Sequence, residues 1–124
     1  MSCTPQDFLS FAIKLSGSAE EIERRAAVSR AYYGAFHIAD QAKTMLPELP
    51  PQEAWSGSHE AVVRRYLADR GNKSSVKLGY ILRDMKNRRE SADYELIGEC
   101  PTQDVLVQIG EAKKIEELAR LLVT

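Results

Sequence analysis

The feature that most constrains the fold is a long helical segment from residue 18 to about residue 45. The run Ser18-Ala19-Glu20-Glu21 at its start has the pattern of a capping box, in which the serine oxygen accepts a backbone amide three residues on and Glu21 reaches back. Prolines from position 47 onward exclude a longer helix. Apolar or small residues recur on two sides of this segment: Val28, Ala31, Tyr32, Ala35, Ala39 and Ala42 on one, and Ile22, Ala26, Ser29, Tyr33 and Phe36 on the other.

A helix that is apolar on both sides has to be covered on both sides, either by its own chain or by a second copy of it. Small residues at Ala31, Gly34, Ala35 and Ala39 would let another helix approach closely. We therefore expect a homodimer formed through this helix, and the alternative is a central helix in a monomeric bundle.

Apolar residues elsewhere recur at spacings of three and four, so we expect an all-α fold of about five helices. A first helix follows the capping residue Thr4 and ends near Gly17. A third is capped by Ser58, after a proline-rich loop over residues 47–57, and ends at Gly71. The apolar face of the first helix is expected to contain Phe8, Phe11, Ala12 and Leu15.

Two further helices complete the expected bundle. The fourth begins near Ser74 or Ser75, and the last follows the break at Cys100-Pro101-Thr102. Their apolar stripes are Leu78, Ile81, Leu82 and Met85 on the fourth, and Val105, Ile109, Ala112, Ile115, Ala119 and Leu122 on the last.

The length of 124 residues fits one domain, so residues 1–124 are assigned to a single module. With 44% hydrophobic and 28% charged residues the chain is typical of a globular protein. No run is long and apolar enough for a membrane helix or a leader peptide, so we expect a cytoplasmic protein without a membrane partner. Cys3 and Cys100 form no metal-ligand pattern, so reduced thiols, no metal and no cofactor are expected.

Charge is strongly segregated along the chain although the formal net charge is only −1. Residues 1–63 hold 5 Lys/Arg and 8 Asp/Glu, residues 64–89 hold 9 and 2, and residues 90–124 hold 3 and 8. The three blocks therefore carry −3, +7 and −5, and a local excess of this size can attract phosphates. One group of basic residues lies on the third helix and its exit, and it either follows a phosphate backbone or is a solvated face. It consists of Arg64, Arg65, Arg70, Lys73 and Lys77, with Tyr66 as the only aromatic residue among them.

The apolar stripe of the fourth helix, extended from Met85 by three and four residues, reaches Arg88 and Arg89. Charged side chains on a packed face have to be paired or hydrated. The two guanidiniums are therefore expected to face a polar cleft or a subunit boundary, or to form salt bridges to nearby aspartates.

The segments Ser29-Arg30-Ala31-Tyr32-Tyr33 and Arg89-Glu90-Ser91-Ala92-Asp93-Tyr94, with His59 between them, resemble the HEPN superfamily, in particular its small stand-alone members. The resemblance covers nearly the whole chain and is weakest in the first and last helices. It implies an antiparallel up-and-down helical bundle that dimerises through its long central helices. It also implies a nucleotidyltransferase partner, often encoded beside it in a toxin–antitoxin pair.

Many HEPN proteins are metal-independent ribonucleases, whose active site is an arginine followed four to six residues later by a histidine. In this chain the window after Arg89 contains Asp93, Tyr94 and Glu95 but no histidine. The loss matters because imidazole exchanges protons near neutral pH and a phenol does not. His37 and His59 are the only imidazoles, and each is either a repositioned base or a structural residue.

The resulting hypothesis is a HEPN-type protein of a toxin–antitoxin or defence pair that binds RNA or a nucleotide at a basic cleft near the dimer interface. One alternative is an active ribonuclease that uses Arg89, Asp93 and Tyr94 with a histidine from elsewhere. Another is a non-catalytic module that holds a nucleotidyltransferase. The candidate nucleic-acid-binding residues are Arg88, Arg89, Arg30, Arg64 and Arg65, because a guanidinium offers paired donors to phosphate oxygens.

Overall fold

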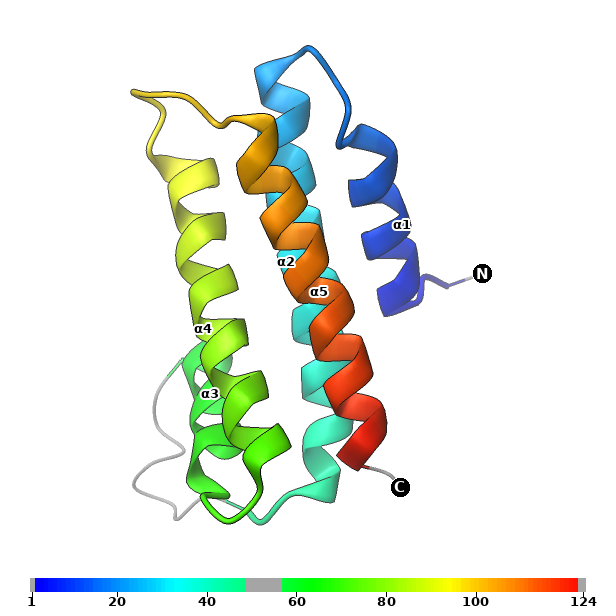
Figure 1. Cartoon of the computed structure of the whole chain (residues 1–124), viewed down its shortest axis with the longest axis vertical. Helices are drawn as coiled ribbons and strands as arrows, with labels where there is room; N and C mark the ends of the chain where they lie inside the picture. Colours follow the sequence, from blue (N-terminus) through cyan, green and yellow to red (C-terminus); the bar gives the residue numbers. More distant parts are fainter. Residues whose placement is uncertain (1, 49–56, 123–124) are drawn as a thin grey trace.

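The computed structural model describes residues 2–48 and 57–122, and both ranges are helical without any strand (Figure 1). The all-helical prediction is confirmed, whereas most of the loop predicted over residues 47–57 lies outside the described residues. No described helix is long and apolar enough to cross a membrane. In chain order the elements are α1 (Pro5–Leu15), α2 (Glu21–Ala42), the 3-10 turn η1 (Lys43–Met45), α3 (Ser58–Ala68), α4 (Lys73–Tyr94) and α5 (Thr102–Leu122).

Of the N-terminal caps predicted for α1 and α2, one is confirmed and the other is wrong. Thr4 caps α1 as predicted, since its hydroxyl accepts from the amide of Asp7, whose carboxylate in turn accepts from the Thr4 amide. The predicted capping box at Ser18 is wrong: α2 begins at Glu21 after the N-cap Glu20, with no side-chain cap. The Ser18 oxygen is already used by the amide only two residues on, so the chain enters the helix later than predicted.

The starts of α3 and α4 are also shifted from their predicted positions. Ser58 is the first residue of α3 rather than its cap, which is Gly57. The side chain of Asn72 caps α4 by accepting from the Ser75 amide at 3.2 Å, so that helix begins at Lys73. These shifts are of one or two residues and leave the predicted apolar face of α4 in place, with Leu78, Leu82 and Met85 fully buried.

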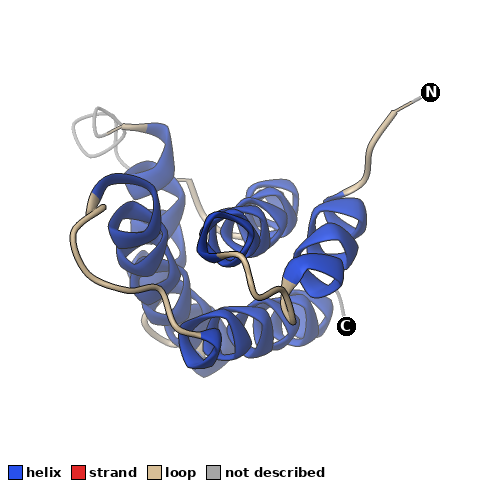
Figure 2. Cartoon of the chain, turned by 90° about the horizontal axis from the view of Figure 1, so that it is seen from above, coloured by secondary structure: helices blue, strands red, loops and turns tan. Residues whose placement is uncertain are grey.

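Helix α2 lies at the centre of the bundle, between α1 and α4, with α5 crossing it and α3 packed on α4 (Figures 1 and 2). The alanine-rich side of α2 is core as predicted, with Ala31, Ala35 and Ala39 fully or almost fully buried, although Ala42 at its end is only partly buried. Ala27, which the prediction did not include, is buried as well. The other side is only partly covered: Ile22 is 72% exposed, and Tyr33 and Phe36 are half-buried. The chain itself therefore covers one of the two sides of α2 completely.

The predicted face of α1 is wrong in one respect. Phe11 is about half exposed, and the buried residues of this helix are Leu9 and Ala12. Phe8 is half-buried against the second side of α2, where its ring lies beside His37 and Arg30.

A buried glutamine joins the three long helices. Gln108 of α5 is fully buried, and its side-chain nitrogen donates to the carbonyls of Val28 on α2 (3.3 Å) and Met85 on α4 (3.0 Å). Its side-chain oxygen accepts from Arg88 at 2.6 Å. A buried amide with all these partners fixes the registers of α2, α4 and α5 relative to one another, because leaving any of its polar atoms unpaired would be costly.

A buried arginine fixes the connection between α4 and α5 in the same way. Arg25 of α2 donates to the carbonyls of Ala92 (2.9 Å), Glu95 (3.0 Å) and Gly98 (3.0 Å), and its Nε lies 3.6 Å from the Glu21 carboxylate. Both Nη atoms and the charge are thereby paired within the fold, so Arg25 is a structural residue.

We expect Gly79→Ala to lower the free energy of unfolding by about 1–3 kcal/mol relative to Gly110→Ala. A Cβ at Gly79 would lie 2.7 Å from Cδ2 and 2.9 Å from Cγ of Leu67, whereas a Cβ at Gly110 on α5 meets nothing within 4 Å. Both changes gain similar helix propensity, so their difference isolates the packing of α3 on α4. Urea unfolding followed by circular dichroism measures it, and equal stability of the two variants would contradict this account of the α3–α4 contact.

Candidate functional site

Arg89 is a buried cation on α4 that the fold does not fully pair. It follows Leu82 and Met85 along the buried face of the helix, so its side chain enters the interior toward α2, and only 9% of it is exposed. Its Nε has no hydrogen-bond partner among the described residues. Unpaired polar atoms of a buried cation are unusual and call for an explanation by function. Arg25, equally buried, shows how completely this chain pairs a guanidinium that only supports the fold.

Aromatic rings surround the Arg89 guanidinium. Its Cζ lies 5.5 Å from the ring centroids of both Tyr32 and Tyr33 on α2. Arg30, one turn earlier on α2, places its Cζ 4.9 Å from the same Tyr33 ring and 5.7 Å from that of Phe8. Two guanidiniums thus converge on one tyrosine, and the electron-rich ring faces stabilise both charges.

Two carboxylates balance this positive charge only weakly. Asp93 lies 3.6 Å from Nη1 of Arg89, and Glu90 lies 4.0 Å from Nη2. Ser29 connects the pairs, because its hydroxyl donates to Asp93 at 3.2 Å and accepts from Arg30 at 3.4 Å. These separations are long for charge-assisted hydrogen bonds, which are normally 2.7–2.9 Å. The donors of both arginines therefore remain available to a stronger anion.

His59, at the start of α3, joins the same cluster from the other side. Its Nδ1 is hydrogen-bonded to the hydroxyl of Tyr32, and its ring stacks on Phe36 with centroids 4.4 Å apart and meets the edge of Tyr33 at 5.8 Å. Burial lowers the pKa of His59, and the nearby positive charges of Arg89 and Lys86 lower it further. The imidazole is therefore neutral at pH 7 and can accept a proton.

The phenol of Tyr32 stays protonated, because burial raises its pKa well above the usual range. The hydrogen bond has two forms: the Tyr32 hydroxyl donates to Nδ1 and the imidazole proton is on Nε2, or Nδ1–H donates to the Tyr32 oxygen and Nε2 keeps a free lone pair. Only the second form leaves Nε2 able to take up a proton. Tyr32 would then orient the imidazole as a carboxylate does in other histidine sites. We refer to Arg30, Tyr32, Tyr33, His59 and Arg89 as the Arg89 site.

Arg88 is not part of this site. Adjacent residues on a helix are rotated by about 100°, and Arg88 accordingly faces α5, where its Nη1 donates to Gln108 and Glu111, both at 2.6 Å. It also lines a separate pocket of about 400 Å³ beside Arg25 and Cys100. The structure thus separates the two arginines that the sequence analysis treated as a pair.

The other predicted binding residues lie outside the Arg89 site. Arg65 donates to the carbonyls of Leu46 and Pro47, and Arg64 lies 3.6 Å from the Glu60 carboxylate on the surface of α3. Arg65 therefore holds the end of η1, whereas Arg64 remains about half exposed.

The residues predicted as catalytic are partly brought together. Arg89 and Asp93 are neighbours, but Tyr94 is 75% exposed at the end of α4, where it shares a surface hollow with Arg89. His37 packs against the rings of Phe8 and Phe36, with centroids 5.2 and 5.6 Å away.

His59 is the residue whose role the sequence could not define. It is 30 positions from Arg89, and only the packing of α3 and α4 around the two tyrosines brings them to one place. No group of three or more His, Cys, Asp or Glu residues within 2–48 and 57–122 is arranged to hold a metal ion. The chemistry that the described residues offer is anion binding by guanidiniums next to a neutral imidazole.

Comparison with protein-family models, curated proteins and solved structures gives no match for this chain. The resemblance to HEPN proteins therefore stays a prediction that rests on the two motifs, and the arguments about function rest on the Arg89 site itself.

Proposed function

We propose that this chain binds RNA or a nucleotide through the Arg89 site, as a HEPN-type protein of a toxin–antitoxin or defence pair. The observation that carries the proposal is Arg89 itself, buried among aromatic rings with an unpaired Nε and only distant carboxylates. A phosphate would offer the Nη atoms of Arg89 and the guanidinium of Arg30 shorter hydrogen bonds than the carboxylates do.

The proposed assembly is an antiparallel bundle that forms a homodimer through the partly covered side of α2. The exposed Ile22 and the half-buried Tyr33 and Phe36 favour such a contact, because apolar side chains on one helix side are otherwise left in water. Tyr33 belongs both to this side of α2 and to the Arg89 site, so in this proposal the cleft lies near the dimer interface. A nucleotidyltransferase is the partner that the HEPN resemblance suggests.

A second function, metal-independent RNA cleavage, is favoured by the position of His59. The neutral imidazole can take the proton from a ribose 2′-hydroxyl, whose oxygen then attacks the adjacent phosphorus. The P–O5′ bond breaks, the leaving 5′-oxygen takes a proton from water, and the products are a 2′,3′-cyclic phosphate and a 5′-hydroxyl. Arg89 and Arg30 would stabilise the charge that develops on the phosphate. In this hypothesis His59, rather than Asp93 or Tyr94, replaces the histidine absent from the motif.

We expect Arg89→Gln to weaken binding of a fluorescein-labelled oligouridylate about tenfold or more, because it removes charge-assisted hydrogen bonds to phosphate. Asp93→Asn should strengthen binding, since it removes the nearest competing carboxylate. Fluorescence anisotropy measures both, and Lys113→Gln, on the exposed surface of α5, removes one charge elsewhere as the control. Equal affinity of Arg89→Gln, Lys113→Gln and the unmodified protein would exclude the Arg89 site as the binding site.

The pKa of His59 should lie below its ordinary value of 6.5, and Arg89→Gln should raise it without restoring 6.5. The substitution removes the repulsion between two positive charges but leaves the burial, which is the larger cause. Because the pKa is lowered in the folded protein, His59 favours folding above pH 6.5 and opposes it as the pH falls through the folded-state pKa. NMR titration of the imidazole tests this, with Lys113→Gln as control; an unchanged pKa in Arg89→Gln would show that the two residues do not interact.

If the cleavage hypothesis is right, the protein cuts a mixed RNA pool in the presence of EDTA, and His59→Ala slows cutting by a factor on the order of 100 to 10,000. The rate should rise with pH through the His59 pKa and then level off, since only the neutral imidazole accepts a proton. Gel analysis of end-labelled products measures the rate and identifies the cyclic phosphate. Absence of cleavage under all conditions would leave binding as the function.

A further inference from the structure

Four of the basic residues on α4 belong to one row that is spaced by three. Lys77, Tyr80, Arg83, Lys86 and Arg89 follow one another at i, i+3 positions. Each step of three residues turns about 60° back around the helix, so the row winds around α4 as it descends. It starts at Arg89, inside the site that faces α2, and ends with Tyr80 and Lys77 on the outward side, about 18 Å along the axis.

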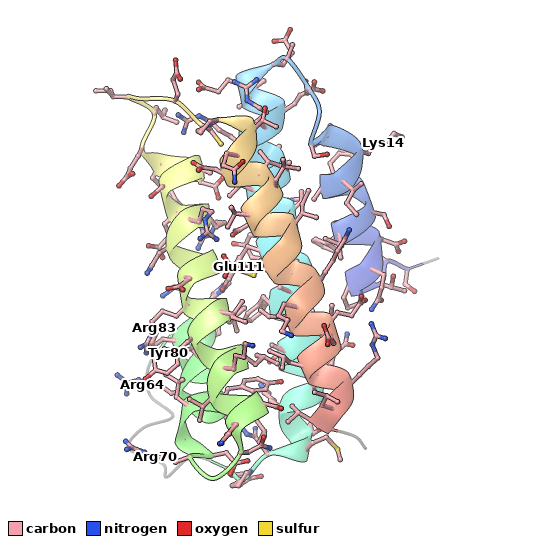
Figure 3. The ribbon with its side chains drawn as sticks, viewed as in Figure 1. Lys14, Arg64, Arg70, Tyr80, Arg83 and Glu111 are labelled. Atoms are coloured by element: carbon pink, nitrogen blue, oxygen red, sulfur yellow. The ribbon has the colours of Figure 1, made fainter. Side chains whose placement is uncertain are left out.

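The outward part of this row is exposed and holds more cations than carboxylates, since Asp84 is the one acidic residue of α4 between Lys77 and Arg89. Figure 3 shows Arg64, Arg70, Tyr80 and Arg83 along one side of α3 and α4. Within the described part of the chain, Arg70 and Lys77 have no ion-pair or hydrogen-bond partner, and both are exposed. The sequence block that contains this face carries +7.

One carboxylate serves three of these cations. Glu60 of α3 lies 2.9 Å from Arg83, 3.6 Å from Arg64 and 3.9 Å from Lys86. A single negative charge shared among three positive ones leaves this stretch positive. Lys86, 3.9 Å from Glu60, is also close enough to His59 to lower its pKa, so the shared cluster adjoins the Arg89 site.

Tyr80 is the aromatic residue of the row, and it is 56% exposed without any ring, ion-pair or hydrogen-bond partner among the described residues. It lies one turn from Lys77 on one side and Arg83 on the other. The aromatic residue expected in this group from the sequence, Tyr66, is instead buried and donates its hydroxyl to the Ala39 carbonyl at 2.7 Å. Alternating cations and an exposed ring are the combination that binds single-stranded nucleic acid, by phosphate contacts and base stacking.

We propose that the row from Arg89 to Lys77, together with Arg64 and Arg70 beside it, is a binding track for single-stranded RNA, and that a base stacks on Tyr80. The inference rests on the proposed RNA-binding function and extends it from one site to a path. A duplex fits less well, because its bases are already stacked and cannot cover the tyrosine ring. The close contact of Gly79 with Leu67 holds α3 against α4, and Glu60 of α3 lies beside Arg83 and Lys86 of α4, so the basic residues of α3 adjoin the middle of the row. Tyr80 lies about 180° around α4 from Arg89, so a bound strand would have to pass around α4.

The test compares a short oligouridylate, which can span the track, with uridine monophosphate, which reaches only the Arg89 site. Tyr80→Ala should weaken oligouridylate binding about fivefold or more and leave the monophosphate unaffected, as judged by the NMR shift of the His59 ring. Tyr80→Phe should keep the affinity, because the ring remains. Lys77→Gln should reduce the dependence of log affinity on log salt by about 0.7, the loss of one phosphate contact.

Phe11→Ala, which removes a half-exposed ring from α1, and Lys113→Gln are the matched controls and should bind like the unmodified protein. If Tyr80→Ala binds the oligouridylate with full affinity, or if duplex RNA binds as tightly as the single strand, the track is refuted. Binding of uridine monophosphate alone, without gain for the oligomer, also refutes the track but leaves the proposed function. If neither ligand binds, the proposed function fails and the track fails with it.

Discussion

The structure depends on the central helix α2 having two different sides. On one side, alanines allow α4 and α5 to pack closely, and the buried amide of Gln108 fixes the register of the three helices. On the other side, the rings of Tyr33 and Phe36 lie against His59 of α3, and Arg30 lies between the rings of Tyr33 and Phe8 of α1. Because the first side fixes α4 against α2, Arg89 is directed toward Tyr32 of the first side and Tyr33 of the second. The site is thus a consequence of how the core packs.

The two buried arginines show how the same side chain takes on different roles in one fold. Arg25 is paired with three carbonyl oxygens and a carboxylate, which offset the desolvation of its charge. Its hydrogen bonds hold the α4–α5 connection in place. Arg89 has rings and long ion pairs instead, which stabilise its charge without using its directional donors. An incoming phosphate has little to offer the first arginine and much to offer the second. The pairing of a buried cation, more than its burial, therefore separates structural from functional arginines here.

The five helices and most of their buried faces could be predicted from the sequence, because apolar periodicity directly reflects packing against a core. The N-caps of α2 and α3 could not be inferred from Ser18 and Ser58, since the Ser18 oxygen accepts the amide of Glu20 instead and neither α2 nor α3 has a side-chain cap. His59 was visible as an imidazole, but its place beside Arg89 arises from tertiary contacts between distant segments. The spacing of three from Lys77 to Arg89 is visible in the sequence. Each step turns the side chain around the helix, so a search for single apolar faces does not group these residues. Arg88 and Arg89 were grouped because they are adjacent, although adjacency on a helix turns side chains apart.

The carboxylates around the basic row explain how so many cations can stay together before a ligand arrives. Glu60, Glu90 and Asp93 lie 3.6 Å or more from every cation of the cluster except Arg83, which is 2.9 Å from Glu60. Ion pairs of this length at a partly exposed surface contribute about 0–1 kcal/mol each, enough to reduce repulsion between the cations. Phosphates with shorter, paired hydrogen bonds can displace them at small cost. The weak ion pairs thus reduce the repulsion between the cations in the free protein, and the phosphates of a nucleic-acid backbone can replace the carboxylates.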